Sequence, residues 1–492
     1  MFRKIVSFLL IPVVVYIIGC GSGSGKVNAV PSDLAFPDNF WWGTSTAAFQ
    51  IEGDDTNVNW YRWAEMGRTE SMPGKASNGY VMYVTDTQLM KKIHMNTYRF
   101  SIEWGRVEPA YNVWDEKAIQ HYHNVIKVLR QNGIRPVVCL HHFTTPLWVE
   151  DPADVEHYPG WVSDFAVEAF LGFVKKMAEE FGDEVDYWIV FNEPNMFTMT
   201  GYWLGVGPPG YGDIFHFDHY LYPALKNVIK AQREAYRIIH EYDTVDADGD
   251  GVAASVGVAQ NMNDYKPVSI TDMNAAWRVT YMLNLIFLDG AVFGKVDFNL
   301  DGKYDYFFPT TSRTLDWIGV NYYSITPVVE FSDLDYLHAF PCISYYIMIG
   351  PEECRVRNSI VTDMGWVVYP QGIYDVVKLA YERYHLPVYI TENGVATRSG
   401  RFRAEFIVAH LYWLWKAIQD GIDVRGYLHW SLMDNYEWGS FFPRFGLYYV
   451  DYAHGYRRIL TEGGKVYGEI AEKNAIPGEF LRDYGDLFLR GE

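Results

Sequence analysis

The sequence predicts a single α/β domain built as a (β/α)8 barrel. Strand-like apolar segments recur between amphipathic helical stretches, which is the order of elements in that fold. A bare barrel needs about 250 residues, so the 492 residues of this chain also predict long loops over the barrel mouth. The eight expected strands centre on Trp42, Arg99, Val138, Ile189, Val256, Ile318, Tyr389 and Tyr427.

Amphipathic helices are expected between these strands, because apolar residues recur there at helical spacing. The clearest are residues 118–132, 161–181, 222–241 and 371–384. Gly133 and Gly182 are expected to close the first two. No linker or change of composition follows Lys26, and no repeat is present, so residues 36–492 are interpreted as one domain.

Two of the expected strands end in a glutamate that is followed at once by a turn residue. One run of β-branched and aromatic residues leads to Asn192, Glu193 and Pro194, and another leads to Glu392 and Asn393. In a parallel barrel, the carboxyl ends of the strands form the reactive face. The layout is typical of a two-carboxylate active site, and two surface glutamates at loop starts are the alternative.

The composition excludes some classes of function. Apolar residues make up 49% of the chain, with 17 Trp and 38 Tyr, which excludes general disorder. Aromatic faces can stack on sugar rings, although most of these rings must belong to the core. The net charge of −20 argues against nucleic acid or another polyanion as a partner, and neutral substrates suffer no such penalty.

Residues 1–19 have the pattern of a signal peptide. Arg3 and Lys4 precede an uncharged run at 5–18, which is too short for a comfortable membrane span. The stretch that ends at Cys20 resembles the bacterial lipobox, in which the cysteine is diacylated and becomes the mature N-terminus. An ordinary secretory peptide that contains a cysteine is the alternative.

Residues 20–35 are accordingly interpreted as a lipidated Cys20 and a flexible tether. We expect an exported lipoprotein on the periplasmic or extracellular side of a bacterial envelope, anchored by lipid and without a transmembrane helix in its mature form. In that oxidising compartment, Cys342 and Cys354 bracket a short loop and are expected to form a disulfide. Cys139 lies in an apolar run and is expected to be buried. The cysteine spacings fit no zinc motif.

Two acidic segments repeat D-x-[DN]-x-D-G, the first half of a calcium loop. Neither has a glutamate at the twelfth position, where Gly257 and Phe308 stand, so an EF-hand is not expected. Structural calcium held by one loop or shared by both, and a pair of Asp/Gly turns, remain as alternatives. The candidate ligands are Asp246, Asp248, Asp250, Asp297, Asn299 and Asp301.

Several segments together resemble glycoside hydrolase family 1. The stretches at Glu193 and Glu392 resemble that family's NEP and ITENG motifs. The resemblance runs from Phe36 to the C-terminus in unbroken order. It implies the barrel fold and a retaining, exo-acting β-glycosidase that needs no cofactor for catalysis. Further matching segments are 40–53, 98–104, 142–148, 316–323 and 430–438.

The resemblance also implies roles for individual residues. Glu193 would be the acid/base and Glu392 the nucleophile, with their carboxyl groups about 5 to 5.5 Å apart as in retaining enzymes. Arg99, Asn321 and Tyr323 would support the nucleophile. The sugar would be bound by Gln50, His142, Asn192, Trp430, Glu437 and Trp438.

Particular residues narrow the substrate that the resemblance implies. Glu437 would repel a 6-phosphate, so unphosphorylated sugars are expected. Glu193 stands where the plant thioglucosidase variant has glutamine, so ordinary O-glycoside hydrolysis is expected. Thr144 and Thr145 depart from the family's usual pattern and leave the aglycone contacts open. β-Glucosides are expected first, and β-galactosides or β-fucosides second.

Two other classes of function fit part of the pattern. A transglycosidase would use the same two glutamates and the same covalent intermediate. A non-catalytic, tethered sugar-binding protein would keep an aromatic pocket, but it would not need both glutamates and Arg99. A hydrolase of small β-linked carbohydrates is therefore favoured, with contact to the membrane only through the lipid, and the oligomeric state stays open.

Overall fold

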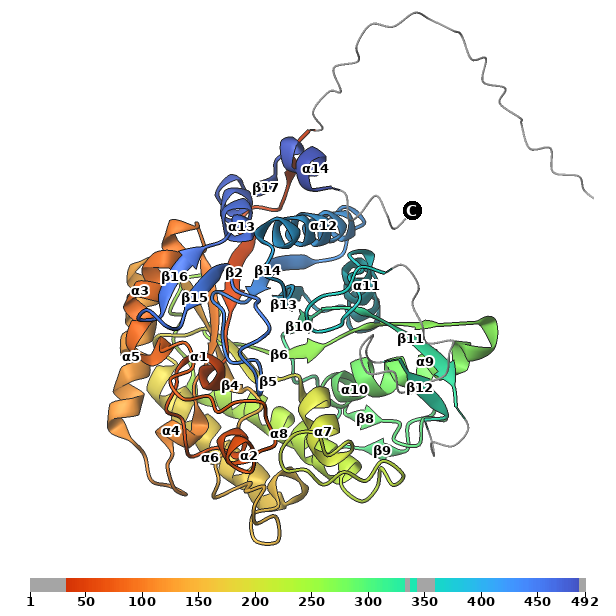
Figure 1. Ribbon diagram of the computed structural model, residues 1–492. Coiled ribbons are helices and arrows are strands. Elements are labelled where there is room, and N and C mark those ends of the chain that lie inside the picture. The colour runs from red at the N-terminus through yellow and green to blue at the C-terminus, as the bar shows by residue number, and fades with distance from the viewer. Residues whose placement is uncertain (1–31, 332–336, 343–358, 486–492) are drawn as a thin grey trace, which may run out of the picture.

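The computed structural model of the protein describes residues 32–331, 337–342 and 359–485. Within these ranges eight parallel strands close a barrel in the order β10-β13-β14-β2-β3-β4-β5-β6 (Figure 1). Each strand contains one predicted centre, which confirms the predicted (β/α)8 barrel. The strands are β2 (Trp41–Ser45), β3 (Thr97–Ser101), β4 (Arg135–His141), β5 (Tyr187–Asn192), β6 (Ser255–Asn261), β10 (Trp317–Asn321), β13 (Val388–Asn393) and β14 (Val424–Trp430).

Helices surround the barrel (Figure 1). The four predicted helices correspond to α5, α6, α8 and α11. The predicted start of α6 was too early: Gly160–Val162 form a separate 3₁₀ turn, and α6 begins after Ser163, whose hydroxyl accepts the Phe165 N–H at 3.1 Å. The long helices are α3 (Gly79–Lys92), α5 (Glu116–Gln131), α6 (Asp164–Phe181), α8 (Leu221–Tyr242), α11 (Gln371–Tyr384), α12 (Gly400–Gln419) and α13 (Glu462–Lys473).

Shorter elements in the connections account for the length beyond a bare barrel. The helical ones are α1 (Ala48–Ile51), α2 (Asn59–Glu65), α4 (Trp104–Val107), α7 (Pro194–Tyr202), α9 (Met273–Thr280), α10 (Ile286–Phe293) and α14 (Gly478–Tyr484). Small sheets are formed by β7 (Asp264–Pro267), β11 (Ile325–Glu330) and β12 (Ala339–Pro341), by β8 (Lys295–Val296) and β9 (Tyr306–Phe307), and by β15 (Tyr448–Asp451) and β16 (Arg457–Leu460).

The barrel strands are buried on both faces, as parallel strands require. Val137, Cys139 and Ile189 belong to a small cluster inside the barrel, whereas Val138 and Val190 belong to the large cluster that packs against the helices. The free Cys139 thiol is fully buried, as predicted. Apolar side chains thus fill the barrel interior below the polar residues at its carboxyl end.

The N-terminal strand β1 (Leu34–Ala35) pairs antiparallel with β17 (Ala475–Ile476). Residues 1–31, and with them Cys20, lie outside the described residues. Cys342 is disulfide-bonded, and its expected partner Cys354 also lies outside them, so that pairing stays a prediction. In the described ranges, no helix has the length and hydropathy that a membrane span requires.

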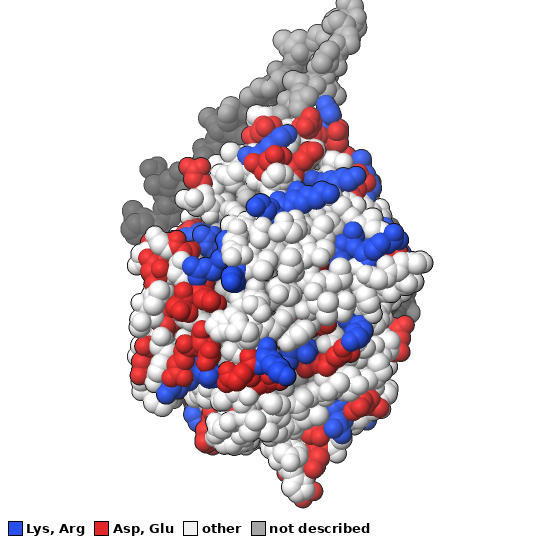
Figure 2. Space-filling view, turned by 90° about the vertical axis from the view of Figure 1, so that its left-hand side faces the viewer, with Lys and Arg blue, Asp and Glu red and all other residues white. Residues whose placement is uncertain are grey.

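The surface over α3 and α5 carries charges of both signs. Figure 2 shows acidic and basic side chains interspersed on this face, with wide uncharged areas between them. A continuous basic surface, which a polyanion would need, does not form on this face.

Candidate active site

The two glutamates identified from the sequence lie at the carboxyl ends of two barrel strands. Glu392 is in β13 and is 4% exposed, and Glu193 directly follows β5 and is 8% exposed. Glu193 caps α7 with a φ of 45°, which is uncommon for a residue other than glycine. Its N–H donates to the Ala259 carbonyl at 2.6 Å, and Pro194 takes the first helical position, where no N–H is needed.

Glu392 is held by a cation and a phenol. Arg99 on β3 is fully buried and forms an ion pair with Glu392 Oε1 through Nη1. The Tyr323 hydroxyl donates to Oε2 at 2.7 Å. Burial raises the pKa of Glu392, and the charge of Arg99 and these hydrogen bonds limit the rise. The guanidinium contact therefore favours the carboxylate form.

Glu193 has a different environment. Its Oε1 accepts hydrogen bonds from Asn321 Nδ2 at 2.9 Å and from Asn261 Nδ2 at 3.1 Å. Among the described residues it forms no ion pair. Burial, followed by the charge of Glu392, raises the pKa of Glu193 to about 8. Glu193 therefore carries a proton at neutral pH.

Asn192 connects the ion pair of Arg99 and Glu392 to His142. Its Oδ1 accepts from Arg99 Nη2 at 2.6 Å and from Asn321 Nδ2 at 3.0 Å. Its Nδ2 lies 2.9 Å from His142 Nε2, and since an amide nitrogen only donates, the imidazole proton is on Nδ1. Burial, and then the charge of Arg99, lowers the pKa of His142 well below its usual value. His142 is therefore neutral.

A second group of polar and aromatic side chains follows β14 and β2. Trp430 Nε1 donates to Glu437 Oε1 at 2.9 Å, and Gln50 Nε2 donates to Asn435 Oδ1 at 3.2 Å. Burial raises the pKa of Glu437 to about 7, and the Trp430 hydrogen bond opposes the rise. The rings of Trp430 and Trp438 lie 5.9 and 5.8 Å from that of His142.

The structure thus gathers the side chains predicted for catalysis and sugar binding at one end of the barrel. Asn261 also contacts Glu193, and the sequence analysis does not identify it. The sequence does contain a signal for Asn261, because this polar residue is the last residue of strand β6 and so lies at the carboxyl end of the barrel. The hydrogen bond from Trp430 to Glu437 is equally unforeseen, because the sequence predicts for both residues only contacts with the sugar.

The two acidic loops lie at opposite ends of α8. Tyr222 in the first turn of α8 contacts Phe298 of the second loop, whereas the first loop follows Asp243 at the other end of the helix. A helix of 22 residues is about 33 Å long. One ion therefore cannot be shared by both loops.

Within the loops, carboxylates accept backbone N–H groups. Asp246 accepts from Gly249 and Gly251 at 2.7 and 2.8 Å. Asp246 and Asp248 also converge with Asp186, which the sequence analysis does not identify, so that three carboxylate oxygens lie within 4.8 Å of one another. Calcium at the first loop stays a prediction, and its role would be structural.

Comparisons with known proteins agree with this geometry. The sequence model of the family described as "Glycosyl hydrolase family 1" matches residues 32–476. The chain is 31% identical to a "Beta-galactosidase" of Pyrococcus woesei, over 90% of this chain and 98% of the relative. It is 30% identical to "Beta-glucosidase A" of Thermotoga maritima, over 90% and 98%. Among solved structures, a β-glycosidase from Pyrococcus horikoshii has a TM-score of 0.79 and 36% identity, with 92% of this chain and 98% of that chain covered.

The barrel and its paired glutamates, with these similarities, define an O-glycoside hydrolase. The chain belongs to glycosyl hydrolase family 1, and it is a β-glycosidase of that family.

Removal of the charge on Glu392 is expected to lower the pKa of Glu193, because a like charge close by disfavours a second ionisation. In Glu392→Gln, the Glu193 titration should move down from about 8, as measured by carbon NMR of carboxyl-labelled protein. Glu437→Gln is the matched control, since Glu437 is not among the causes of the Glu193 shift. An unchanged Glu193 titration in Glu392→Gln would contradict this electrostatic coupling.

Proposed function

We propose that the protein is a retaining, exo-acting β-glycosidase that removes terminal non-reducing β-linked sugars from small carbohydrates. The observation that supports this most directly is the contrast between two buried carboxyl groups. A guanidinium limits the rise in the pKa of Glu392. Among the described residues, the Glu193 side chain accepts hydrogen bonds from two amides and has no cation in contact, and its pKa is raised to about 8. One group is suited to be an anion and the other an acid.

In the first step, Glu193 donates its proton to the glycosidic oxygen while the Glu392 carboxylate attacks the anomeric carbon. The bond from that carbon to the leaving oxygen breaks, and an ester bond to Glu392 forms on the opposite face of the sugar. The aglycone leaves as an alcohol. Tyr323 and Arg99 hold both oxygens of Glu392, which aims the carboxylate before the sugar arrives.

In the second step, Glu193 takes a proton from water as the water oxygen attacks the anomeric carbon. The ester bond to Glu392 breaks, so that the sugar is released, Glu392 leaves as a carboxylate and Glu193 is protonated again. Because the ester has no charge, the main like charge that raises the pKa of Glu193 is gone, and the carboxylate can act as a base. The two inversions together retain the β configuration.

The sugar itself would be bound by the polar groups around the two glutamates. Among the described residues, His142 Nδ1 and Gln50 Oε1 are buried without a hydrogen-bond partner, and such atoms are costly unless a ligand or water satisfies them. We assign His142 and Asn192 to the hydroxyls next to the anomeric carbon, and Gln50 and Glu437 to the outer hydroxyls. Trp430 and Trp438 supply the aromatic walls.

Glutamate at position 437 favours unphosphorylated sugars, because its carboxyl group would repel a phosphate on the outer hydroxyl. The relatives carry the names β-galactosidase and β-glucosidase, and a Thermotoga maritima β-glucosidase that is 27% identical has been solved with deoxynojirimycin. We infer a preference for glucosides, with galactosides or fucosides as secondary substrates.

This preference predicts the order of kcat/KM on a panel of aryl β-glycosides. The β-glucoside should be the best substrate, the β-galactoside and β-fucoside next, and a 6-phospho-β-glucoside the poorest. Glu437→Ser should reduce the difference in kcat/KM between the β-glucoside and the 6-phospho-β-glucoside, since it removes the carboxyl group that repels the phosphate. A higher kcat/KM for the phosphorylated substrate than for the β-glucoside in the unmodified enzyme would overturn the preference.

Loss of the acid/base should depend on the leaving group. Glu193→Ala is expected to lower kcat/KM on substrates with poor leaving groups by about 10²- to 10⁴-fold, and to have far less effect on activated aryl glycosides, because only the former need a proton at departure. Added azide should yield the β-glycosyl azide. Equal losses across leaving groups would remove Glu193 from this role.

The transglycosidase alternative shares every group described so far. It differs only in whether water or a second sugar intercepts the ester. Product analysis with and without an added acceptor sugar distinguishes the two functions, and hydrolysis as the major route in both conditions is expected.

We further propose that the protein is a lipoprotein anchored through Cys20. The proposal rests on the sequence of residues 1–25. The position of β1 supports it, because β1 leads into the amino end of β2, and the candidate site lies at the carboxyl ends of the strands. A tether that leads into β1 would therefore join the barrel at the end opposite the barrel mouth.

Cys20→Ala should move the protein from the membrane fraction to the soluble fraction without a change in kcat/KM on a soluble aryl glycoside, since the anchor is remote from the site. Fractionation and mass spectrometry of the mature N-terminus test this. An unmodified protein that fractionates as fully soluble, or that lacks a diacylglyceryl group on Cys20, would refute the anchor and leave the glycosidase assignment intact.

A further inference from the structure

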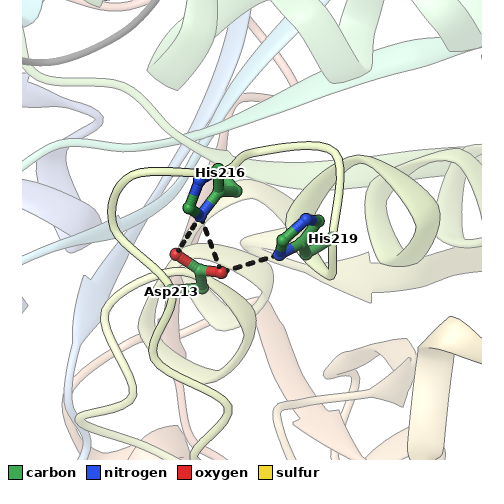
Figure 3. Close-up of side chains that lie close together, drawn as sticks. All are labelled: Asp213, His216 and His219. Atoms are coloured by element: carbon green, nitrogen blue, oxygen red, sulfur yellow. Dashed lines mark hydrogen bonds and ion pairs between the residues drawn. The ribbon is translucent and has the colours of Figure 1, made fainter.

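A group of metal-ligand residues lies outside the candidate active site, in the loop between α7 and α8. Asp213, His216 and His219 stand at intervals of three residues, and Figure 3 shows both imidazoles turned toward the carboxylate between them. Asp213 Oδ1 lies 3.0 Å from His216 Nδ1, and Oδ2 lies 2.8 Å from His219 Nδ1. One ligand atom of each residue lies within 4.8 Å of the other two.

The loop around these side chains is fixed by packing. Phe217, between the two histidines, is 1% exposed, and its ring meets that of Trp203 edge to face at 5.1 Å. Trp203 Nε1 donates to the Ile214 carbonyl at 3.1 Å, and the His219 N–H donates to the His216 carbonyl at 3.3 Å. The backbone that carries the three side chains is therefore preorganised, which lowers the entropic cost of binding an ion.

The spacing of the Asp213 carboxylate from the two histidine nitrogens is close to that of a zinc site, and the ligand atoms of the two histidines lie within 4.8 Å of each other. Zinc bonds to histidine nitrogen and carboxylate oxygen of about 2.0 to 2.2 Å place neighbouring tetrahedral ligands about 3.3 Å apart. Both Nδ1 atoms lie close to the same oxygen, Asp213 Oδ2, at 3.1 Å for His216 and 2.8 Å for His219. These are distances of N–H···O hydrogen bonds, so outward shifts of a few tenths of an ångström would admit an ion. The imidazole side chains are 55% and 52% exposed, which leaves a path for entry and a position for water.

We propose that Asp213, His216 and His219 bind one divalent transition-metal ion, with zinc as the natural representative. The ligands are a carboxylate oxygen and the two Nδ1 atoms, and water completes a tetrahedron. On binding, each Nδ1 gives up its proton to solvent or to Nε2 of the same ring, and its lone pair goes to the metal. Calcium and magnesium prefer oxygen ligands and are disfavoured by the two imidazoles.

Two other surface Asp–His pairs in the described part of the chain can be compared with the group of Asp213, His216 and His219. Asp154 with His157 and Asp451 with His454 have the same spacing of three residues and distances of 2.8 and 2.9 Å. Each pair has only one imidazole, and neither belongs to a group of three converging metal ligands. The second imidazole, that of His219, distinguishes the group at Asp213 from these two pairs. His454 is therefore a matched control, because it contacts an aspartate at the same spacing without a second imidazole.

The proposed ion would tie together the loop that follows α7, the helix that begins next to Glu193. The three ligands contact neither glutamate, and the proposal does not depend on the proposed function. We therefore expect zinc to stabilise the loop while the kcat on an activated aryl glycoside stays within its wild-type range in the ligand variants.

The test is zinc binding by the purified full chain, prepared without a polyhistidine tag and stripped with a chelator. Isothermal titration with Zn²⁺ should show one site in the unmodified protein. His216→Ala and His219→Ala should each weaken that site by about tenfold or more, since even the loss of an outer-shell partner costs 10- to 100-fold in other metal sites. His454→Ala should bind as the unmodified protein does, and Ca²⁺ should neither bind at this site nor compete with Zn²⁺.

Cobalt supplies a second readout that a merely structural hydrogen-bonded cluster would not give. Co²⁺ should produce visible absorption bands of a nitrogen- and oxygen-ligated ion in the unmodified protein and in His454→Ala, and the bands should be lost in His219→Ala. Equal zinc affinity in the unmodified protein and in His219→Ala, or the absence of zinc binding to the unmodified protein, would overturn the proposal.

Discussion

The buried ion pair between Arg99 and Glu392 sets the charge state of the whole candidate site. Both side chains lie inside the barrel, where an isolated charge would be expensive and a well-bonded pair is tolerated. Tyr323 donates a further hydrogen bond to Glu392, and Asn192 accepts one from Arg99. Glu392 can therefore remain an anion, and that anion raises the pKa of Glu193. A single guanidinium on β3 thus separates the roles of two chemically identical residues.

The register of the barrel places the groups that mediate this coupling. Asn321 at the end of β10 pairs with Glu392 of β13 on one side and with Asn261 of β6 on the other. From that position its amide donates both to Glu193 and to Asn192. An amide with two N–H groups can bridge the two halves of the site without adding charge. Parallel strands make this possible because their carboxyl ends meet at one face.

The sequence predicts the barrel well because its strands are short, buried segments that alternate with amphipathic helices. Glu193 and Glu392 are predictable for the same reason, since a carboxylate at a strand end has a fixed place in such a barrel. The pairing of Trp430 with Glu437 and the contact of Asn261 with Glu193 are not predictable, because they depend on side-chain directions across different strands. The early start assigned to α6 has a local cause: Trp161 and Val162 are apolar and directly precede the helix, but the Ser163 cap starts the helix after them.

The charges in the pocket are the physical basis of the proposed preference for neutral sugars. Among the described residues, the three carboxyl groups of Glu193, Glu392 and Glu437 share the candidate site with one buried cation, that of Arg99. Burial raises the pKa of Glu437 to about 7 and helps to raise that of Glu193 to about 8. Near neutral pH, Glu193 is therefore largely protonated and Glu437 is partly protonated. The charge of Glu392 is balanced by that of Arg99. As the pH rises through these values, Glu437 and then Glu193 become anions, the acid form is lost and the pocket gains uncompensated negative charge. A phosphorylated sugar would bring the same excess at neutral pH, whereas an uncharged hydroxyl can donate to Glu437 in either of its protonation states.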